Sequence, residues 1–496
     1  MTPCEYVGAV KFVFWILLAA QGVAAPTNWP VPPRPIEPNP VPAPARPGIN
    51  VPEAPLLPMP ASPYVLPLTN ALARPKAIPP PSGFPLPTDI MRESLQYRPA
   101  PPTPVSIAAT QAVAYPQPVT PKPAVLETNR TFYVAPDGTD ENDGTKEKPF
   151  RTIQKAADVA QPGDTVLVAP GSYEGFATRR GGKPQQPIRF KADGEVLILS
   201  NHNTPADHIL VRGTDWIVIE GFVCREAGRA GIAILNSSDV VISNNVCGPN
   251  EKWGIFTGFA PRIQILHNKA FGSRQQHGIY VSNSNVPDDH PVIRGNECYH
   301  NAGSGIQLNG DCQMGGDGII NAALIEGNIV HHNDLKGLSL ISIEGSRIQN
   351  NVIYHNGRKG SAGGIHLTDE PHCGKPSRYN TVVNNTICEP GIAAIRLSDG
   401  ASKNIIFNNL LLGRGIANEV PDNEIDAESN LHSDRAADYV VDAEGFDFRL
   451  AYNSRASHAG KASFEQQSAP AHDIQGVPRS PQAPSVGAYD IVLTPR

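Results

Sequence analysis

Asparagine recurs at the end of short runs of Val and Ile, and this repeat constrains the fold more than any other feature of the chain. The fragments "PVIRGNECYHN" (291–301), "ALIEGNIVHHN" (323–333) and "SRIQNNVIYHN" (346–356) show the pattern. When the fragments are aligned on this asparagine, seven corners follow one another at intervals of 23 to 34 residues. They are Asn245, Asn268, Asn296, Asn328, Asn351, Asn385 and Asn409, and Gly221 takes the same place in one earlier unit.

A second series of apolar strands lies between these corners. Most begin with Gly-Ile, from "GIAILN" at Gly231 to "GIHLTD" at Gly364, and "AIRLSD" follows from Ala394. A repeat of roughly 20–50 residues indicates a solenoid or a propeller. A propeller blade needs four strands, a leucine-rich repeat needs its own leucine frame, and no helical period separates these strands. The repeat therefore predicts short strands that stack turn upon turn into parallel sheets.

Stacking explains why the same residue types return. Each residue lies beside its counterpart roughly 4.8 Å away in the next turn. Asparagine at a sharp corner tolerates left-handed dihedrals, and amides stacked in register can bond one another. We expect the recurring Ile and Val to fill the interior. Cys224 and Cys247 occupy equivalent places, followed by Ala270 and Cys298, which favours a buried cysteine stack. A disulfide between Cys224 and Cys247 is the alternative.

The N-terminal part of the chain has a different composition. The apolar run 12–20 follows Lys11, and small residues at 23–25 suit a signal peptidase, so we expect a signal peptide over 1–25. The rival interpretation is a retained membrane anchor, but the run is shorter than the roughly 20 residues that span a bilayer. Residues 26–128 hold most of the 51 prolines and predict a disordered linker, either a spacer or a dispensable segment.

The remainder of the chain resembles a known superfamily. The opening "FYVAPDGTDENDGTKEKPFRTIQKAADVAQPGDTVLVAPGSYEG" predicts a strand over 131–136, a helix over 150–160 and a strand from 165. This opening and the tail "DFRLAYNSRASHAG" resemble the ends of exported bacterial β-helix proteins. The repeats resemble the right-handed parallel β-helix, or pectin-lyase-like, superfamily. The resemblance implies an all-β solenoid over 129–412, an N-terminal capping helix and a C-terminal capping segment over 413–496.

Alternate residues of the Gly-Ile strands point outward, and this outward row predicts a groove. The row is apolar at one end and polar in the middle; it contains Ala233, Phe256, Tyr280, Gln307, Ser339, His366 and Arg396. The turns that follow these strands lengthen at 284–290, 311–318 and 369–378, and long turns beside a polar strand face make a groove wall. Cys312 and Cys373 lie in two of these turns and can be joined as a staple.

The predicted groove holds two sets of candidate residues. The catalytic candidates are His366, Arg396, Tyr280, Asp311 and Asp369. The candidates for substrate binding are His277, Gln307, Asn309, Glu370 and His372.

Two chemistries suit these side chains. In a uronide lyase or epimerase, a base removes the proton next to the sugar carboxylate after a cation has neutralised that carboxylate. His366 or Tyr280 is then the base or acid, and Arg396 is the neutralising cation. In a glycosidase two carboxyls flank the bond, and Asp311 and Asp369, two turns and thus roughly 9–10 Å apart, fit the inverting class better than the retaining class.

The chain departs from the calcium-dependent lyases of this superfamily. Their clustered aspartates plus lysine are not found in a matching turn, and Lys336 lies beside a strand without such neighbours. No metal ligands are predicted, and the cofactor is left open, with calcium as one candidate. The net charge of −6 and the lack of a basic block argue against nucleic acid as a partner.

The sequence thus predicts an exported monomer, secreted or at the cell surface or in the periplasm, that acts on a polysaccharide. No membrane span is expected once the signal peptide has been removed. The alternative is a non-catalytic carbohydrate-binding or cell-surface protein.

Overall fold

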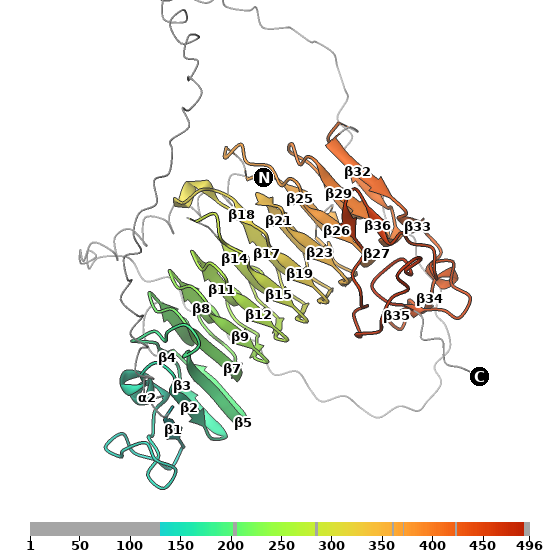
Figure 1. The fold of residues 1–496 in the computed structure, drawn as a ribbon. Coiled ribbons are helices and arrows are strands. Elements are labelled where there is room, and N and C mark those ends of the chain that lie inside the picture. The colour runs from blue at the N-terminus through green and yellow to red at the C-terminus, as the bar shows by residue number, and fades with distance from the viewer. Residues whose placement is uncertain are drawn as a thin grey trace, which may run out of the picture. The chain divides into compact units, whose positions relative to one another are not determined.

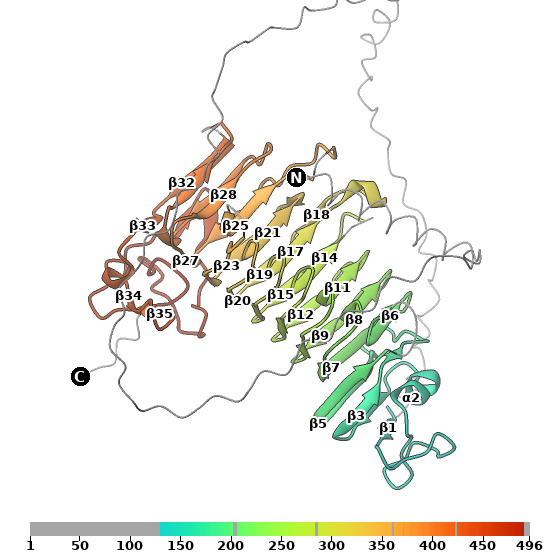
Figure 2. The ribbon, with the colours of Figure 1, turned by 180° about the vertical axis from the view of Figure 1, so that it is seen from behind.

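The computed structural model describes residues 129–201, 206–282, 286–359, 362–370, 372–421 and 424–490. The predicted signal peptide and proline-rich linker lie outside these residues. Successive windings of the chain stack side by side into a parallel β-helix (Figures 1 and 2). The all-β parallel fold predicted from the repeat is thereby confirmed. No helix in the described ranges is both long and apolar enough to cross a membrane.

Sheet A, with 21 strands, forms two rows that meet at the asparagine corner. The first row contains β1 (Thr131–Val134), β2 (Thr165–Val168), β5 (Ile188–Ser200), β7 (Ile217–Cys224), β9 (Val241–Ser243), β12 (Gln264–Leu266), β15 (Val292–Arg294), β19 (Leu324–Glu326), β23 (Arg347–Gln349), β26 (Thr381–Val383), β29 (Asn404–Phe407) and β32 (Ile425–Glu428). The second row contains β3 (Gly171–Glu174), β10 (Val246–Cys247), β13 (Lys269–Phe271), β16 (Glu297–Tyr299), β20 (Ile329–His331), β24 (Val352–Tyr354), β27 (Thr386–Glu389), β30 (Leu410–Gly413) and β33 (Leu431–Ser433). The long strands β5 and β7 take part in both rows. Parallel pairing continues through β33, beyond residue 412.

Sheet B, with ten strands, contains the Gly-Ile series. Its strands are β4 (Phe176–Ala177), β6 (Ile209–Arg212), β8 (Ala230–Leu235), β11 (Trp253–Gly258), β14 (Ile279–Ser282), β17 (Ile306–Asn309), β21 (Leu338–Ile341), β25 (Ala362–Thr368), β28 (Ala393–Leu397) and β31 (Ile416–Asn418). The short strands β18 (Ile320–Asn321) and β22 (Ile343–Glu344) pair separately. Inward-pointing Ile and Leu fill the core between the sheets, as predicted; for example Ile255, Ile279 and Ile306 are fully buried.

The corner asparagines form a continuous ladder. The side chain of each one donates to the side-chain oxygen of the next, as Asn328 does to Asn351 at 2.9 Å, and all seven predicted members are buried. The predicted role in left-handed dihedrals was wrong for these residues. The residue before each one has positive φ instead, for example Asn350 at 55° and Gly327 at 63°. The preceding residue makes the turn, and this aims the ladder amide inward.

This one-residue offset also corrects the first unit. Gly221, aligned with the asparagines in the sequence, has a φ of 86° and matches the turn position. Phe222 takes the ladder position, since its backbone N–H donates to Asn245 Oδ1 at 2.9 Å.

The cysteine column is confirmed as a stack of free thiols. Cys224 pairs in register with Cys247, Cys247 with Ala270, and Ala270 with Cys298. All three cysteines are buried and free, as is Cys388. The alternative disulfide between Cys224 and Cys247 is therefore wrong for this structure.

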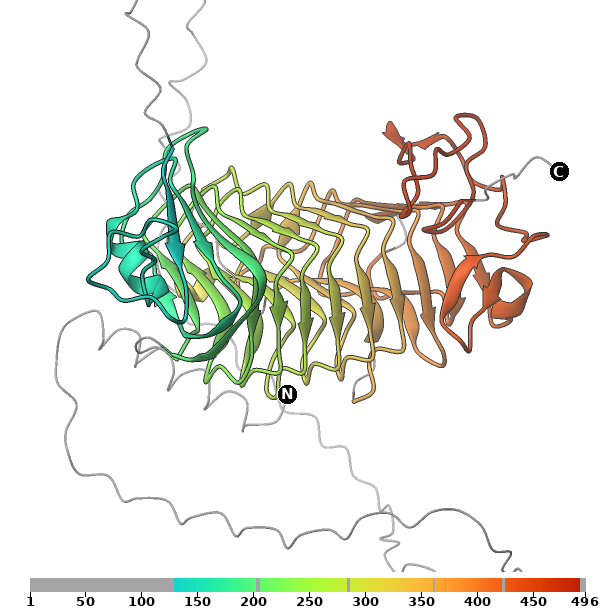
Figure 3. The same ribbon diagram turned by 90° about the horizontal axis from the view of Figure 1, so that it is seen from below.

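Separate elements close the two ends of the solenoid (Figure 3). Helix α2 (Ile153–Val159) lies at the N-terminal end, within the longer helix predicted over 150–160, and buries Ile153, Ala156 and Ala157. At the other end, the hairpin of β34 (Val440–Asp442) and β35 (Asp447–Leu450) precedes β36 (Ser463–Phe464) and β37 (Gln467–Ser468). Phe448 of this end packs on Tyr354, with ring centroids 4.9 Å apart. Both ends thus cover apolar surface that an open winding would expose.

Candidate functional site

The outward row predicted on sheet B is straight and in register. Tyr280 pairs with Gln307, Gln307 with Ser339, Ser339 with His366, and His366 with Arg396. Side chains far apart in sequence therefore form one file along the solenoid. Ser339 is almost fully buried although it points outward, so larger neighbouring side chains cover it. Ser339 is the floor of the polar part of the row.

A second column runs beside this file. It consists of the residue that precedes each recurring glycine, namely Ala230, Trp253, His277, Ser304 and Lys336. Pairing of Trp253 with Ala230 shows that the column is in register at its start. Lys336 lacks the aspartate neighbours expected of a calcium-dependent lyase, and its position in this column is the sequence signal that points to it instead.

Lys336 lies in a cluster of basic side chains. Burial lowers the pKa of its ammonium, and repulsion from Arg396 lowers it further. Within the described part of the chain, no carboxylate lies within ion-pair distance of Lys336, although Arg396 Nη2 lies 2.8 Å from Glu419 Oε1. A desolvated lysine without an anionic partner gives up its proton more readily than an ordinary lysine does, and the amine so formed can accept a proton.

The two histidines of the cluster are held neutral. Burial lowers the pKa of His277 and of His366 to about 3 each, and repulsion from Lys336 adds to both shifts. His277 Nδ1 accepts from the backbone N–H of Ser304 at 2.9 Å, which leaves the proton on Nε2. The basic cluster thus consists of Lys336, Arg396 and two neutral imidazoles, and it can receive an anion.

His366 is oriented by a chain of hydroxyls. Its Nε2 lies 2.8 Å from Ser398 Oγ, and Ser398 Oγ lies 2.9 Å from Asp399 Oδ2. Thr368 Oγ1 also donates to Asp399 Oδ2 at 2.7 Å. If Ser398 gives its one proton to the carboxylate, it accepts from His366, so Nε2 of the imidazole is protonated. His366 Nδ1 then keeps its lone pair, and no group of the described residues bonds to it.

Acidic side chains gather where the strands end. Asn309 donates to Glu370 Oε2 at 3.0 Å, and its own oxygen accepts from the backbone N–H of Asp311 at 2.9 Å. Burial raises the pKa of Asp311 and of Glu370. Burial also raises the pKa of Tyr280 to about 12, so this phenol keeps its proton. Sheet B therefore has an acidic border beside its basic cluster.

A disulfide holds this acidic border. Cys312 and Cys373 are joined with their Cα atoms 5.7 Å apart, so the predicted staple is confirmed. Asp369 accepts from Ser342 Oγ at 3.2 Å and from the backbone N–H of Lys375 at 3.1 Å. These bonds order the loop and engage the Asp369 carboxylate. Of the remaining candidates, Gln307 is half-buried in the outward row and His372 is exposed beside Glu370.

Calcium does not fit the side chains that are present. Across the ranges that the structure describes, no three His, Cys, Asp or Glu side chains gather in a way that could hold a metal ion. Asp311 and Glu370 favour their protonated forms more than ordinary carboxyls do, whereas a hard cation needs ionised oxygen ligands. We therefore derive no step that passes through calcium.

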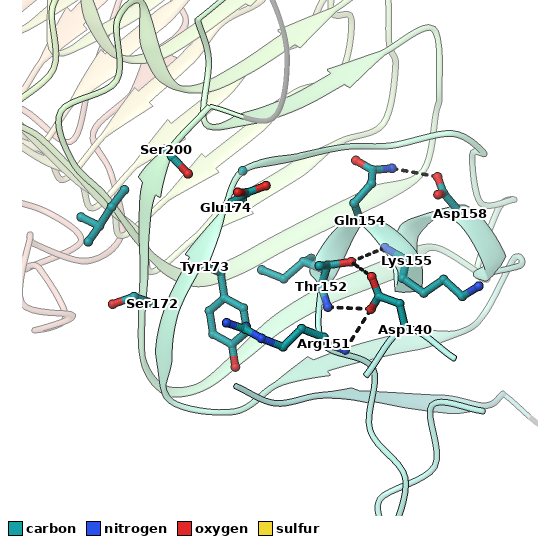
Figure 4. A pocket seen from close by; sticks show the side chains of 13 residues that line it. Asp140, Arg151, Thr152, Gln154, Lys155, Asp158, Ser172, Tyr173, Glu174 and Ser200 are labelled. Carbon is teal, nitrogen blue, oxygen red and sulfur yellow. Dashed lines mark hydrogen bonds between the residues drawn. The ribbon is translucent and has the colours of Figure 1, made fainter. Parts of the chain in front are cut away.

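A pocket of about 670 Å³ lies at the N-terminal end, away from the predicted residues (Figure 4). Its lining includes Asp140, Arg151, Lys155, Asp158 and Glu174. The Asp140 carboxylate is occupied by the start of α2, since it accepts from the backbone N–H groups of Arg151 and Thr152 at 2.9 Å. This pocket therefore belongs to the N-terminal end of the solenoid. The candidate site is the outer face of sheet B, where the predicted residues lie.

Comparisons with known proteins agree with this architecture. The model of the family described as "Pel9A-like, right handed beta helix region" matches residues 132–284, and that of "Right handed beta helix region" matches 273–430. The crystal structure of pectate lyase Pel9A superposes with a TM-score of 0.55 at 18% identity, over 74% of this chain and 97% of that enzyme. The chain has the right-handed parallel β-helix fold of the pectin-lyase-like superfamily.

Two curated relatives of this β-helix protein match only in part. An uncharacterized protein of Bacillus subtilis, YwoF, is 27% identical over 228 residues, 43% of this chain and 44% of the relative. Pectate lyase PEL9 of Emericella nidulans is 35% identical over 92 residues, 17% of this chain and 22% of the relative. The β-helix protein thus matches less than half the length of these relatives, and its fold is better defined than its activity.

Proposed function

We propose that this β-helix protein binds an acidic polysaccharide along sheet B and cleaves it by β-elimination, with Lys336 as the base. The observation that carries the proposal is the desolvated Lys336 ammonium beside Arg396 and the neutral His366. Matches to pectate lyases support a uronate polymer as the substrate class, in line with the Pel9A-like family match and the relative PEL9.

The reaction needs three roles from the chain. Arg396 pairs with the substrate carboxylate and so stabilises the charge that develops on the adjacent carbon. Lys336, in its deprotonated form, takes the proton from that carbon, and the electron pair forms a carbon–carbon double bond as the glycosidic oxygen leaves. The leaving oxygen then takes up the proton that Lys336 has removed from the carbon, which returns Lys336 to its starting form. Every bond made and broken is then accounted for without a co-reactant.

Asp311 and Glu370 support a second candidate reaction. Their raised pKa values suit a general acid, which a glycoside hydrolase needs beside a second carboxylate. Asp369, the partner expected from the sequence, is engaged in loop hydrogen bonds. The β-elimination proposal is therefore preferred, and hydrolysis is the alternative to be tested with it.

Export is part of the proposal. The disulfide between Cys312 and Cys373 supports an oxidising compartment, because such bonds are rare where glutathione keeps thiols reduced. A secreted, periplasmic or cell-surface location also gives access to a polysaccharide.

The test incubates the purified full-length chain with polygalacturonate, alginate and chondroitin. Ultraviolet absorbance of an unsaturated uronate supports β-elimination, and new reducing ends without that absorbance show hydrolysis. Retention on immobilised polysaccharide without any product shows a binding protein and overturns the enzyme proposal.

The assignment of the base is tested by substitution. Lys336→Ala is expected to lower kcat/KM roughly 10²–10⁴-fold, the usual contribution of a general base. Lys403→Ala is the matched control, since this lysine contacts Tyr379 Oη at 3.2 Å, outside the basic cluster. Equal activity of the two variants would remove Lys336 from the mechanism.

A further inference from the structure

The outward row of sheet B has an apolar end that the proposed reaction does not use. Trp253 and Phe256 stack with ring centroids 4.4 Å apart and an interplanar angle of 17°. Tyr280 lies 5.6 Å from Phe256 and 6.0 Å from Trp253 by the same measure. We call these three rings the aromatic platform. It lies on the outer surface of sheet B and belongs to a small apolar cluster distinct from the interior core.

The aromatic platform is continuous with the basic cluster. Phe256 pairs in register with Tyr280, Tyr280 with Gln307 and Gln307 with Ser339, so Phe256 lies three windings from the floor of the cluster. At roughly 4.8 Å per winding, this separation is roughly 14 Å. A linear ligand that extends along the file from Lys336 must cross the platform.

Two cationic side chains lie against the platform. The Arg229 guanidinium lies over the Phe256 ring, 5.5 Å from its centroid, in a salt bridge with the buried Asp207 carboxylate, and the Lys252 ammonium lies 5.7 Å from the centroid of Trp253. Burial lowers the pKa of Lys252, and repulsion from Arg229 adds to this shift. Because Asp207 neutralises Arg229, the aromatic rings and the Lys252 ammonium are what suit a ligand that has both an apolar face and an anionic group.

Trp253 adds an unused hydrogen-bond donor. Its side chain is 7% exposed, and its indole Nε1–H has no acceptor among the residues that the structure describes. A buried donor without an acceptor is unfavourable, and a hydrogen bond to a ligand oxygen would relieve this cost.

We propose that the aromatic platform is a remote sugar subsite, where the apolar face of a pyranose ring stacks on Phe256 and Tyr280. The occupant is a distal unit of the same acidic polysaccharide whose reacting unit lies at Lys336. This inference rests on the proposed function for the polymer's identity, but the contact is made several sugar units away from the reacting bond. The protein therefore selects long chains over short ones.

The experiment measures oligogalacturonide binding by calorimetry on the full-length chain, with a trisaccharide and an octasaccharide as probes. The quantity compared is the association constant of the octasaccharide divided by that of the trisaccharide. Phe256→Ala is expected to lower this ratio roughly tenfold, which is the contribution of one stacked ring to binding. Phe256→Tyr retains the ring and should retain the ratio, which separates lost stacking from misfolding. Tyr452→Ala removes a ring that is 80% exposed in the C-terminal segment and serves as the control.

The outcomes distinguish this inference from the proposed reaction. A tenfold fall in the ratio without any unsaturated product supports the subsite and contradicts the lyase. Unsaturated product with an unchanged ratio overturns the subsite alone, and a wild type that binds no oligogalacturonide overturns it too. A gain in octasaccharide affinity on Phe256→Ala would also overturn the inference.

Discussion

His366 Nε2 lies 2.8 Å from the hydroxyl oxygen of Ser398, so the direction in which Ser398 donates its own proton decides which nitrogen of the ring is protonated. The Ser398 hydroxyl is in turn directed to Asp399. A carboxylate, a hydroxyl and an imidazole thus form a line that ends at the free Nδ1 lone pair. The arrangement orients the His366 ring but leaves it without a positive charge, because burial lowers the pKa of the imidazole to about 3.

Ser398→Ala is therefore expected to release the ring. Nitrogen NMR of the labelled histidine should change from one tautomer, protonated at Nε2, to a mixture. On a substrate that the wild type cleaves, kcat should fall by up to roughly tenfold with little change in KM. A fall of this size corresponds to the loss of one hydrogen bond. Ser398→Thr keeps the hydroxyl and should rescue both readouts. A single unchanged tautomer in Ser398→Ala would contradict the positioning role.

The disulfide that holds the acidic border should contribute strongly to stability. Cys312 and Cys373 are 61 residues apart, and closing a loop of this size is worth about 4 kcal/mol in the chain-entropy account. The double variant Cys312→Ser, Cys373→Ser should lower the urea midpoint accordingly. A reductant should destabilise the wild type to the same level and have no effect on the double variant. Destabilisation of that variant by reductant would point to another redox-sensitive bond.

The middle of the asparagine ladder should be more sensitive than its end. Asn328 donates to Ile293 O and Asn351 Oδ1 at 2.9 Å, and it accepts from Asn296 Nδ2 at 3.0 Å. Asn328→Ala leaves these buried groups without partners, so the free energy of unfolding should fall by about 3 kcal/mol or more. Asn430→Ala, at the half-buried end of the ladder, should cost less than half as much. Equal losses in urea unfolding would contradict cooperative stacking.

Glu389 should make stability depend on pH. It ends a second ladder, in which the side chain of Asn301 donates to Asn333 and that of Asn333 to Asn356. Asn356 donates to Glu389 from its backbone and its side chain at 2.9 Å, and burial raises the pKa of Glu389 to about 7. Because the folded state holds this proton more tightly than the unfolded chain, the stabilisation is complete below the ordinary value of 4.5. It is lost as the pH rises through about 7.

The predicted loss is up to about 3 kcal/mol between about pH 5 and about pH 8. Urea unfolding of Glu389→Gln should show a smaller difference between these two conditions than the wild type. Glu195→Gln, at an exposed position of β5, should retain the wild-type difference. An identical pH dependence in wild type and Glu389→Gln would show that this carboxyl is not the source.

The repeat predicted the fold well because backbone stacking forces equivalent residues into columns. Ile255, Ile279 and Ile306 were placed inward by alternation alone, and they are buried. The cysteine column and the staple between Cys312 and Cys373 followed from the same alignment. The one-residue error at the corners arose because asparagine suits both the turn and the ladder, so composition could not separate the two positions.

The candidate site was only partly predictable. The order Tyr280, Gln307, Ser339, His366 and Arg396 along one face follows from strand register, which the repeat gives. The role of Lys336 does not, because it precedes the strand and its basicity is set by burial and by Arg396, a residue two windings away. The relay from Asp399 through Ser398 depends on turn geometry that strand alternation does not describe.

The asparagine ladder has a consequence for how such a protein changes over evolutionary time. Every winding offers the next one the same donors and acceptors that it receives from the one before. Duplication of one complete winding would leave both neighbours satisfied, whereas an insertion of half a winding would interrupt the file of amides. The length of polymer that such a surface spans can therefore grow in whole steps, each adding one more strand to the recognising face.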